Sequence, residues 1–269
     1  MTSVGDLAAY RAVLASRMRS QRTYRFNFRL DLGSSLLVGI VELAEVAVLY
    51  TSVHRIGGLD LSAVLLVFGL ADLTYSIADL AVGHCDTLPT YLRAGTIDVF
   101  YLRPQPLLLQ LITSDISLRR LARAGVGLAA LVVGLVVNDI DWTPGHVAVL
   151  LLAVPCGIAI SAAMYVWAAG AQFFLVDGAE ATNAFVYGGR YAATQPASVW
   201  ARPLQALFGF LFPMAFTGYL PTVAVLGLSG PAWLPAWLAW CTPLAAGWVW
   251  LLALGSWRLG VRHYQGAGG

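Results

Sequence analysis

Long apolar runs separated by short charged segments constrain the fold of this chain more than any other feature. A helix needs about 20 mostly apolar residues to cross the hydrocarbon core of a bilayer. Six runs come close to or exceed that length, at residues 33–53, 61–83, 120–137, 146–176, 203–227 and 234–257. We therefore expect an all-α polytopic membrane protein with six transmembrane helices over residues 33–257, built as a single domain spanning residues 1–269. Pro213 and Pro221 are expected to kink or end the fifth helix.

Composition agrees with this class, because the chain is 59% hydrophobic and only 11% charged, whereas soluble domains carry about 25% charged residues. Residues 1–32 are rich in arginine and lack the cleavage site of a signal peptide. Within them Leu7, Tyr10, Leu14 and Met18 recur at helical spacing. This pattern predicts an amphipathic helix in the membrane interface, and a plain basic anchor is the alternative.

The arginines predict the orientation of the six spans. No lysine occurs, and fifteen of the sixteen arginines fall on one side of a six-span chain, including Arg190 and Arg202 between the fourth and fifth spans. Only Arg55 falls on the other side, where Asp139 and Asp141 also lie. By the positive-inside rule the arginine-rich side is cytoplasmic. Both termini, with the tail 258–269, are then cytoplasmic, and residues 188–205 form a second interfacial element on that side.

The stretch "LRAGTIDVFYLRPQP", residues 92–106, contains charges and prolines between two apolar runs. Such a segment cannot lie in hydrocarbon, because its charges and backbone groups would stay unsatisfied. As a short amphipathic helix it would offer apolar anchors and charged groups to a groove in another protein. The apolar anchors are Leu92, Ile97, Val99, Phe100 and Tyr101, and the charged groups are Arg93, Asp98 and Arg103. An ordinary solvated loop is the alternative.

Several of these residues resemble a motif of a known family. Arg93, Gly95, Ile97, Asp98, Leu102, Arg103 and Pro104 are similar to a cytoplasmic motif in the permease subunits of type 2 ABC exporters, the ABC-2 family. The likeness continues in Asn183 and Tyr191, in "FPMAFTGYLP" and in the tail "GVRHYQGAG". It covers nearly the whole chain and is closest to the viologen-exporter-like permeases. Substrate identity does not transfer with it.

The resemblance implies a set of partners and roles. Residues 92–106, which begin with Leu92, would form the coupling helix between spans two and three. This helix would dock on a dimer of ABC ATPase (nucleotide-binding) subunits. A second permease, identical or homologous, would complete the pathway in a prokaryotic cytoplasmic (inner) membrane, among membrane lipids and without nucleic acid. Pro213, Tyr219 and Pro221 would serve gating or structural roles.

The chain lacks the sequence of an ATPase. No G-x-x-x-x-G-K-[ST] motif occurs, and a chain without lysine cannot build one. We therefore expect that it is not an enzyme and binds no cofactor or metal itself, so that ATP and Mg are bound by the partner ATPase. "GLSG" around Ser229 matches a motif of membrane serine proteases, but the only later histidine, His263, would lie across the bilayer.

Carboxylates inside the predicted spans, Glu42, Glu45, Asp72 and Asp79, need a special environment. An ionised Asp at the centre of a membrane helix costs about 2.5–3.5 kcal/mol, so these groups should face the protein interior or a watery cavity. One hypothesis is a negative lining that attracts cationic or amphiphilic substrates, with Tyr75 adding cation–π contact. The alternatives are hydrogen bonding between spans, or a position of Asp79 near the cytoplasmic surface beside Arg93.

The function that these features favour is the permease subunit of an ATP-driven exporter for amphiphilic or cationic compounds. A secondary transporter or ion channel subunit not coupled to ATP is the alternative, because intramembrane acids suit both. That alternative leaves residues 92–106 without an explanation, and no convincing inverted repeat is present.

Overall fold

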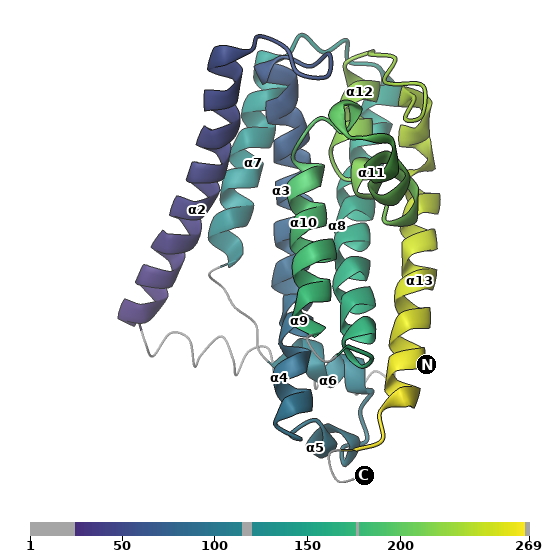
Figure 1. Ribbon diagram of the computed structural model, residues 1–269. Helices are drawn as coiled ribbons and strands as arrows, with labels where there is room; N and C mark the ends of the chain where they lie inside the picture. Colours follow the sequence, from purple (N-terminus) through teal and green to yellow (C-terminus); the bar gives the residue numbers. More distant parts are fainter. Residues whose placement is uncertain (1–24, 115–119, 176–177, 267–269) are drawn as a thin grey trace.

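The structure, a computed structural model, describes residues 25–114, 120–175 and 178–266 as an elongated helical bundle (Figure 1). Five helical stretches are long and apolar enough to cross a membrane. They contain α2 (Arg25–Ser52), α3 (Leu61–Val82), α7 (Arg120–Val137), α8 (Pro144–Gln172) and α13 (Thr242–His263). One end of the bundle, here called the α5 end, holds α4 (Leu88–Arg93), α5 (Asp98–Tyr101) and α6 (Leu107–Ser114). The opposite α12 end holds α11 (Arg202–Ala206) and α12 (Tyr219–Val225).

Helices α3 and α7 pack closely because small residues lie between them. A Cβ atom on Gly69 of α3 would lie 2.3 Å from the backbone nitrogen of Leu131, and one on Gly127 of α7 would lie 2.6 Å from that of Leu73. Small residues at such crossings let backbones approach within van der Waals contact, which drives helix association in membranes. The Asp60 side chain caps α3 by accepting a hydrogen bond from the Ala63 N–H at 2.9 Å.

Residues 178–193 carry the chain from the α5 end back toward the α12 end, alongside α8 (Figure 1). This passage consists of α9 (Gly178–Ala181), a π-helical stretch (Thr182–Tyr187) and α10 (Gly188–Ala193). Just beyond it, the Ser198 hydroxyl donates a hydrogen bond to the Gly57 carbonyl in the α2–α3 connection, at 2.8 Å. The prediction that residues 188–205 lie at the same end as residues 92–106 is therefore wrong. The passage is short and polar, so hydropathy did not reveal it.

Most of residues 203–227, predicted as the fifth span, form a bent pair of helical arms at the α12 end rather than one straight helix. The arms, Arg202–Leu211 and Met214–Val225, meet at 70°. Leu228 and Ser229, which follow the pair, line one cavity together with Gly57 and with Ser198, which precedes it. The bent pair as a whole therefore begins and ends at the α12 end of the bundle.

Of the two prolines predicted to kink or end the fifth span, only one lies at the bend between the arms. Pro213 lies in the break between the arms, where it offers no N–H to continue a helix. The kink predicted there is confirmed. Pro221 lies in the first turn of α12, where a missing N–H is tolerated, and the helix continues to Val225.

Other boundaries also differ from the prediction. Helix α2 is already helical at Arg25, eight positions before the predicted start at residue 33. Helix α13 continues to His263, so residues 258–263 belong to the last helix rather than to a tail. The interfacial helix predicted for residues 1–32 lies mostly outside the described residues.

Candidate functional site

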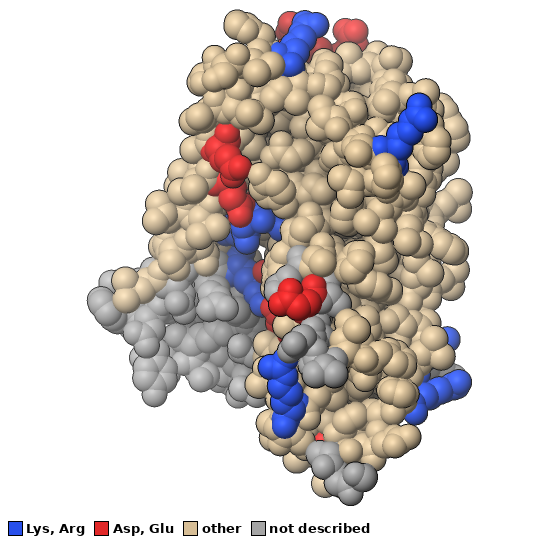
Figure 2. Space-filling view, viewed as in Figure 1, with Lys and Arg blue, Asp and Glu red and all other residues tan. Residues whose placement is uncertain are grey.

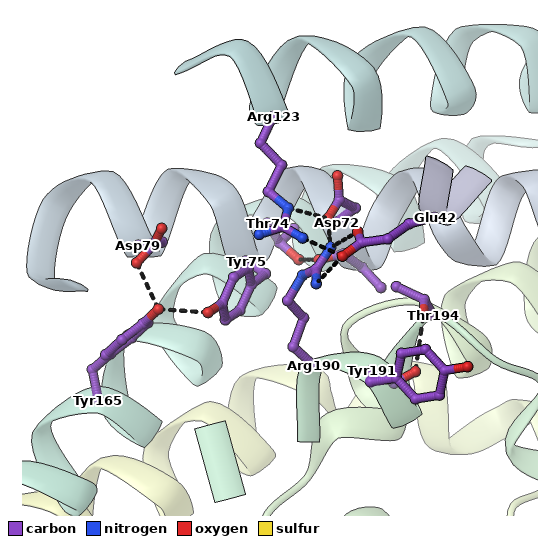
Figure 3. Close-up of polar contacts among 11 residues, drawn as sticks. Glu42, Asp72, Thr74, Tyr75, Asp79, Arg123, Tyr165, Arg190, Tyr191 and Thr194 are labelled. Carbon is purple, nitrogen blue, oxygen red and sulfur yellow. Dashed lines mark hydrogen bonds and ion pairs between the residues drawn. The ribbon is translucent and has the colours of Figure 1, made fainter. Parts of the chain in front are cut away.

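Charged side chains from four helices meet inside the bundle: Glu42 of α2, Asp72 of α3, Arg123 of α7 and Arg190 of α10 (Figure 3). Arg190 donates to Asp72 at 2.6 Å and binds Glu42 through both of its terminal nitrogens, at 2.5 and 3.1 Å. Arg123 also donates to Glu42, and its Nε lies 3.7 Å from Asp72. These four residues form the central ion network, which joins four segments that are far apart in the sequence.

Burial makes the central ion network structurally important. Asp72 is 0% exposed and Arg190 is 6% exposed. Transferring an ion out of water costs several kcal/mol, which a partner in good geometry must offset. The guanidinium of Arg190 also lies 5.1 Å from the centre of the Tyr75 ring, where a cation is attracted to the ring face. The network therefore fixes α10 against α2 and α3.

A second cluster lies about two turns along α3 from Asp72. Asp79 accepts a hydrogen bond from the Tyr165 hydroxyl at 2.6 Å and forms an ion pair with Arg120 at 3.2 Å. The Tyr165 hydroxyl in turn lies 2.6 Å from the Tyr75 hydroxyl (Figure 3). Tyr75 thus touches both clusters through its ring and its hydroxyl, so that a shift at one cluster would disturb the other.

A polar cavity of about 350 Å³ opens beside α2 at the level of these clusters. It is lined by Ser34, Ser35, Val38, Asp79, Asp86, Arg120, Arg123 and Tyr187. Figure 2 shows basic and acidic side chains gathered in a recess on this face. Because the lining carries both signs of charge, it is not the uniformly negative surface that the sequence suggested.

The predicted pathway carboxylates occupy different settings. Glu42, Asp72 and Asp79 are each paired with arginines from other helices. This arrangement corresponds to the alternative of polar bonding between spans. Glu45 instead accepts a hydrogen bond from Tyr191 at 2.9 Å, without an arginine at salt-bridge distance in the described part of the chain.

Three arginines of the site, Arg120, Arg123 and Arg190, were not predicted as site residues. The positive-inside rule had assigned them to cytoplasmic segments. The signal that could have found them is charge balance, because a carboxylate buried within a bundle requires a cation nearby. Within the described residues, no group of three or more His, Cys, Asp or Glu side chains is arranged to hold a metal ion.

The predicted coupling segment, residues 92–106, lies at the α5 end but is not one continuous helix. The last turn of α4 is followed by Gly95, whose φ of +65° favours glycine. The short helix α5 and an irregular stretch then lead to α6. Gln110 of α6 braces the segment by donating to the carbonyl groups of Phe100 and Gln105, at 3.0 and 2.7 Å.

The residues of this segment divide into an inner and an outer group. Ile97 is completely buried, Leu92 is half-buried against the core, and Asp98 accepts a hydrogen bond from the Tyr264 hydroxyl at 2.8 Å. These three attach the segment to its own chain. Arg93, Leu102, Arg103 and Pro104 are exposed, and so are the predicted anchors Val99 and Tyr101. Leu102 is 85% exposed, so its side chain is available for contact with a partner.

Long apolar helices and the buried ion pairs between them define an α-helical polytopic membrane protein. A family model described as "ABC-2 family transporter protein" matches residues 36–268. The chain belongs to this family and is a transmembrane permease of the ABC transporters, a transport component rather than a catalytic one. No curated protein and no solved structure matches the chain. The predicted family is confirmed, and the closer likeness to viologen-exporter-like permeases stays a prediction.

Proposed function

We propose that this permease forms half of the translocation pathway of an ATP-driven exporter in a prokaryotic cytoplasmic membrane. The α5 end and both termini face the cytoplasm, where a dimer of ABC ATPase subunits binds ATP and Mg. A second permease, identical or homologous, completes the pathway. The observation that carries the proposal is the coupling segment, which is anchored inward through Ile97 and presents Leu102 and Arg103 outward.

The link between the coupling segment and the buried charges supports a mechanism. Residues Leu61–Arg93, which include α3 and α4, form one 33-residue membrane-span candidate that leads directly into the segment. Asp72 and Asp79 lie on this stretch. A displacement of the segment by the ATPase would therefore move α3 relative to α2 and α10. Ion pairs suit such a movement between two packed arrangements, because each charged group is paired with particular partners in one arrangement and must leave them to reach the other.

The cavity beside α2 supports amphiphilic compounds as the substrate class. Its polar lining includes Asp79 and Asp86 together with Arg120 and Arg123, so it offers partners to a charged group of either sign. The neighbouring surface of α2 is apolar, with Leu37 62% and Val41 56% exposed. A compound with an apolar body and a charged group would find complementary surface on both.

The test of the proposal compares two leucines at opposite ends of the bundle. Leu102→Asp should weaken co-purification with the ATPase about tenfold or more, since central apolar contacts dominate interface energies. Leu228→Asp, at a leucine that is 38% exposed at the α12 end, should leave it unchanged. Leu102→Asp should likewise reduce the stimulation of ATP turnover by the permease, and Leu228→Asp should not. If both variants bind and stimulate like the wild type, the coupling segment is not the docking site. Transport driven by an ion gradient without any ATPase would favour the secondary-transporter alternative.

A further inference from the structure

An apolar groove on the outer face of the bundle is not used by the proposed transport mechanism. It runs between α8, the π-helical stretch and α13, and has a volume of about 640 Å³. Its lining is almost entirely apolar: Trp167, Ala171, Phe174, Leu175, Phe185, Leu251, Leu252, Gly255, Ser256 and Leu259. Trp167 and Phe185 meet edge to face, with ring centres 5.0 Å apart. The groove is therefore bordered by rigid aromatic rings.

Among the described residues of α13, the basic side chains all lie toward the α5 end: Arg258, Arg262 and His263. Arg262 and His263 follow Leu259 by three and four residues, a spacing that places side chains on the same face of a helix. Both are exposed. The His263 ring stacks on that of Phe174, a groove residue, with ring centres 4.7 Å apart. The groove is therefore apolar along its length and basic at one end.

The length of the groove matches one leaflet of a membrane. Leu251 and Arg262 are eleven residues apart on a continuous helix, which corresponds to about 16 Å at the helical rise of 1.5 Å per residue. Half of a bilayer's hydrocarbon core is about 15 Å thick. Arg262 lies in the last turn of α13, where a membrane helix reaches the headgroups.

We infer that the groove binds an anionic phospholipid. One acyl chain lies along Leu251, Gly255 and Leu259, and the headgroup phosphate accepts hydrogen bonds from Arg262 and His263. The single basic end favours this occupant over a second copy of the chain, because an amphiphile with one charged terminus has the same polarity as the groove. The site is separate from the cavity beside α2 and does not depend on the ATPase.

Two glycines of α13 allow a matched test of the acyl-chain contact. A Cβ atom on Gly255 or on Gly247 would meet nothing within 4 Å, so leucine fits at both positions, but only Gly255 lines the groove. The full-length permease is purified in detergent with phosphatidylglycerol or with phosphatidylcholine of the same acyl chains, and bound lipid is counted by native mass spectrometry. Gly255→Leu should lower retained phosphatidylglycerol about tenfold by filling the groove, and Gly247→Leu should not.

The basic end is tested with charge variants. Arg262→Ala should lower retained phosphatidylglycerol about fivefold, should leave phosphatidylcholine unchanged, and should be rescued by Arg262→Lys. Wild-type protein that retains both lipids equally would overturn the proposal, as would equal retention by the Gly255 and Gly247 variants. A change in oligomeric state with Gly255→Leu, with lipid retention intact, would assign the groove to a second copy instead.

Discussion

Arg190 of α10 and Asp72 of α3 are 118 residues apart in the sequence, and their side chains meet at 2.6 Å inside the bundle. The same arginine also binds Glu42 of α2, 148 residues away. Through these contacts a short, polar segment is fixed against two apolar helices. Its position therefore depends on side-chain charge more than on hydrophobicity.

Removing Arg190 should destabilise the permease strongly. Arg190→Ala leaves Asp72 buried without its closest partner, which costs about 3–5 kcal/mol of unfolding free energy. The double variant Arg190→Met with Asp72→Leu should recover most of this loss, because Glu42 keeps its pair with Arg123. Arg202→Ala, at an exposed position, should change stability by less than about 0.5 kcal/mol. Thermal unfolding in detergent measures all of these, and a wild-type melting temperature for Arg190→Ala would contradict a structural role.

Glu45 offers the cleanest test of an acidic pathway, because its hydrogen bond to Tyr191 lies outside the central ion network. Glu45→Gln removes the charge and keeps a side-chain oxygen for Tyr191. If α2 attracts cations, cellular resistance to lipophilic dications should fall about fivefold, the effect of losing about 1 kcal/mol of attraction. Amounts of assembled protein should stay constant.

Two further variants complete that test. Glu180→Gln, on exposed α9, should export normally. The double variant Glu42→Gln with Glu45→Gln should also lose assembly, because Glu42 binds two arginines. Normal assembly and export by the double variant would show that neither acid lines the pathway.

The α3–α7 crossing can be probed with neighbouring glycines. Gly127→Ala places a Cβ 2.6 Å from the Leu73 backbone nitrogen, so the helices must separate, at a cost of about 1–3 kcal/mol. Gly125→Ala, two residues earlier, meets nothing within 4 Å and should gain up to about 1 kcal/mol from helix propensity. Thermal unfolding should rank Gly125→Ala first, the wild type second and Gly127→Ala last, and any other order would contradict this packing.

The course of residues 178–198 predicts which side of the membrane they reach. In a background without Cys85, Cys156 and Cys241, Val199→Cys and Ala232→Cys should react with a membrane-impermeant thiol reagent in intact cells. Both positions are exposed, and they adjoin Ser198 and Pro231, which line one cavity at the α12 end. Thr96→Cys, at the α5 end, should react only after the cells are opened. Protection at 199 together with labelling at 232 would show that the chain does not cross the membrane in this passage.

The link between the last helix and the coupling segment should depend on pH. Burial and the hydrogen bond to Asp98 raise the pKa of Tyr264 to about 12, from about 10 for a free tyrosine. Since the folded pKa is the higher one, the stabilisation is complete below about pH 10 and is lost as pH rises through the folded value. The protection of residues 92–106 against hydrogen exchange, measured relative to the base-catalysed intrinsic rate at each pH, should fall over that range. Tyr264→Phe should show the fast exchange already at neutral pH, and identical profiles for both proteins would refute the link.

The apolar helices were predictable because each is a long run of apolar residues, and such a run can be buried without any particular partner residue. The course of residues 178–193 was not predictable. Hydropathy scores Arg190 and Tyr191 as unfavourable for a membrane, because it treats each residue alone and does not include the distant carboxylates that bind them. Residues 203–227 show the opposite case. They were predicted as one membrane span because they are apolar enough to cross a membrane, but Pro213 breaks the helix. The position of the coupling segment followed from its charges, whereas the contact between Asp98 and Tyr264 joins residues 166 apart, beyond the reach of local patterns.

The central ion network also bears on how the chain enters the membrane during synthesis. Arginine at the centre of a membrane helix costs about 2.5–3.5 kcal/mol, so residues 178–193 would insert poorly on their own. Glu42, Asp72 and Arg123 are all translated earlier, so a site for Arg190 is ready before it leaves the ribosome. We therefore expect this passage to insert in a late docking step onto α2 and α3, and a nascent chain with either acid neutralised should stall with the passage outside the bilayer.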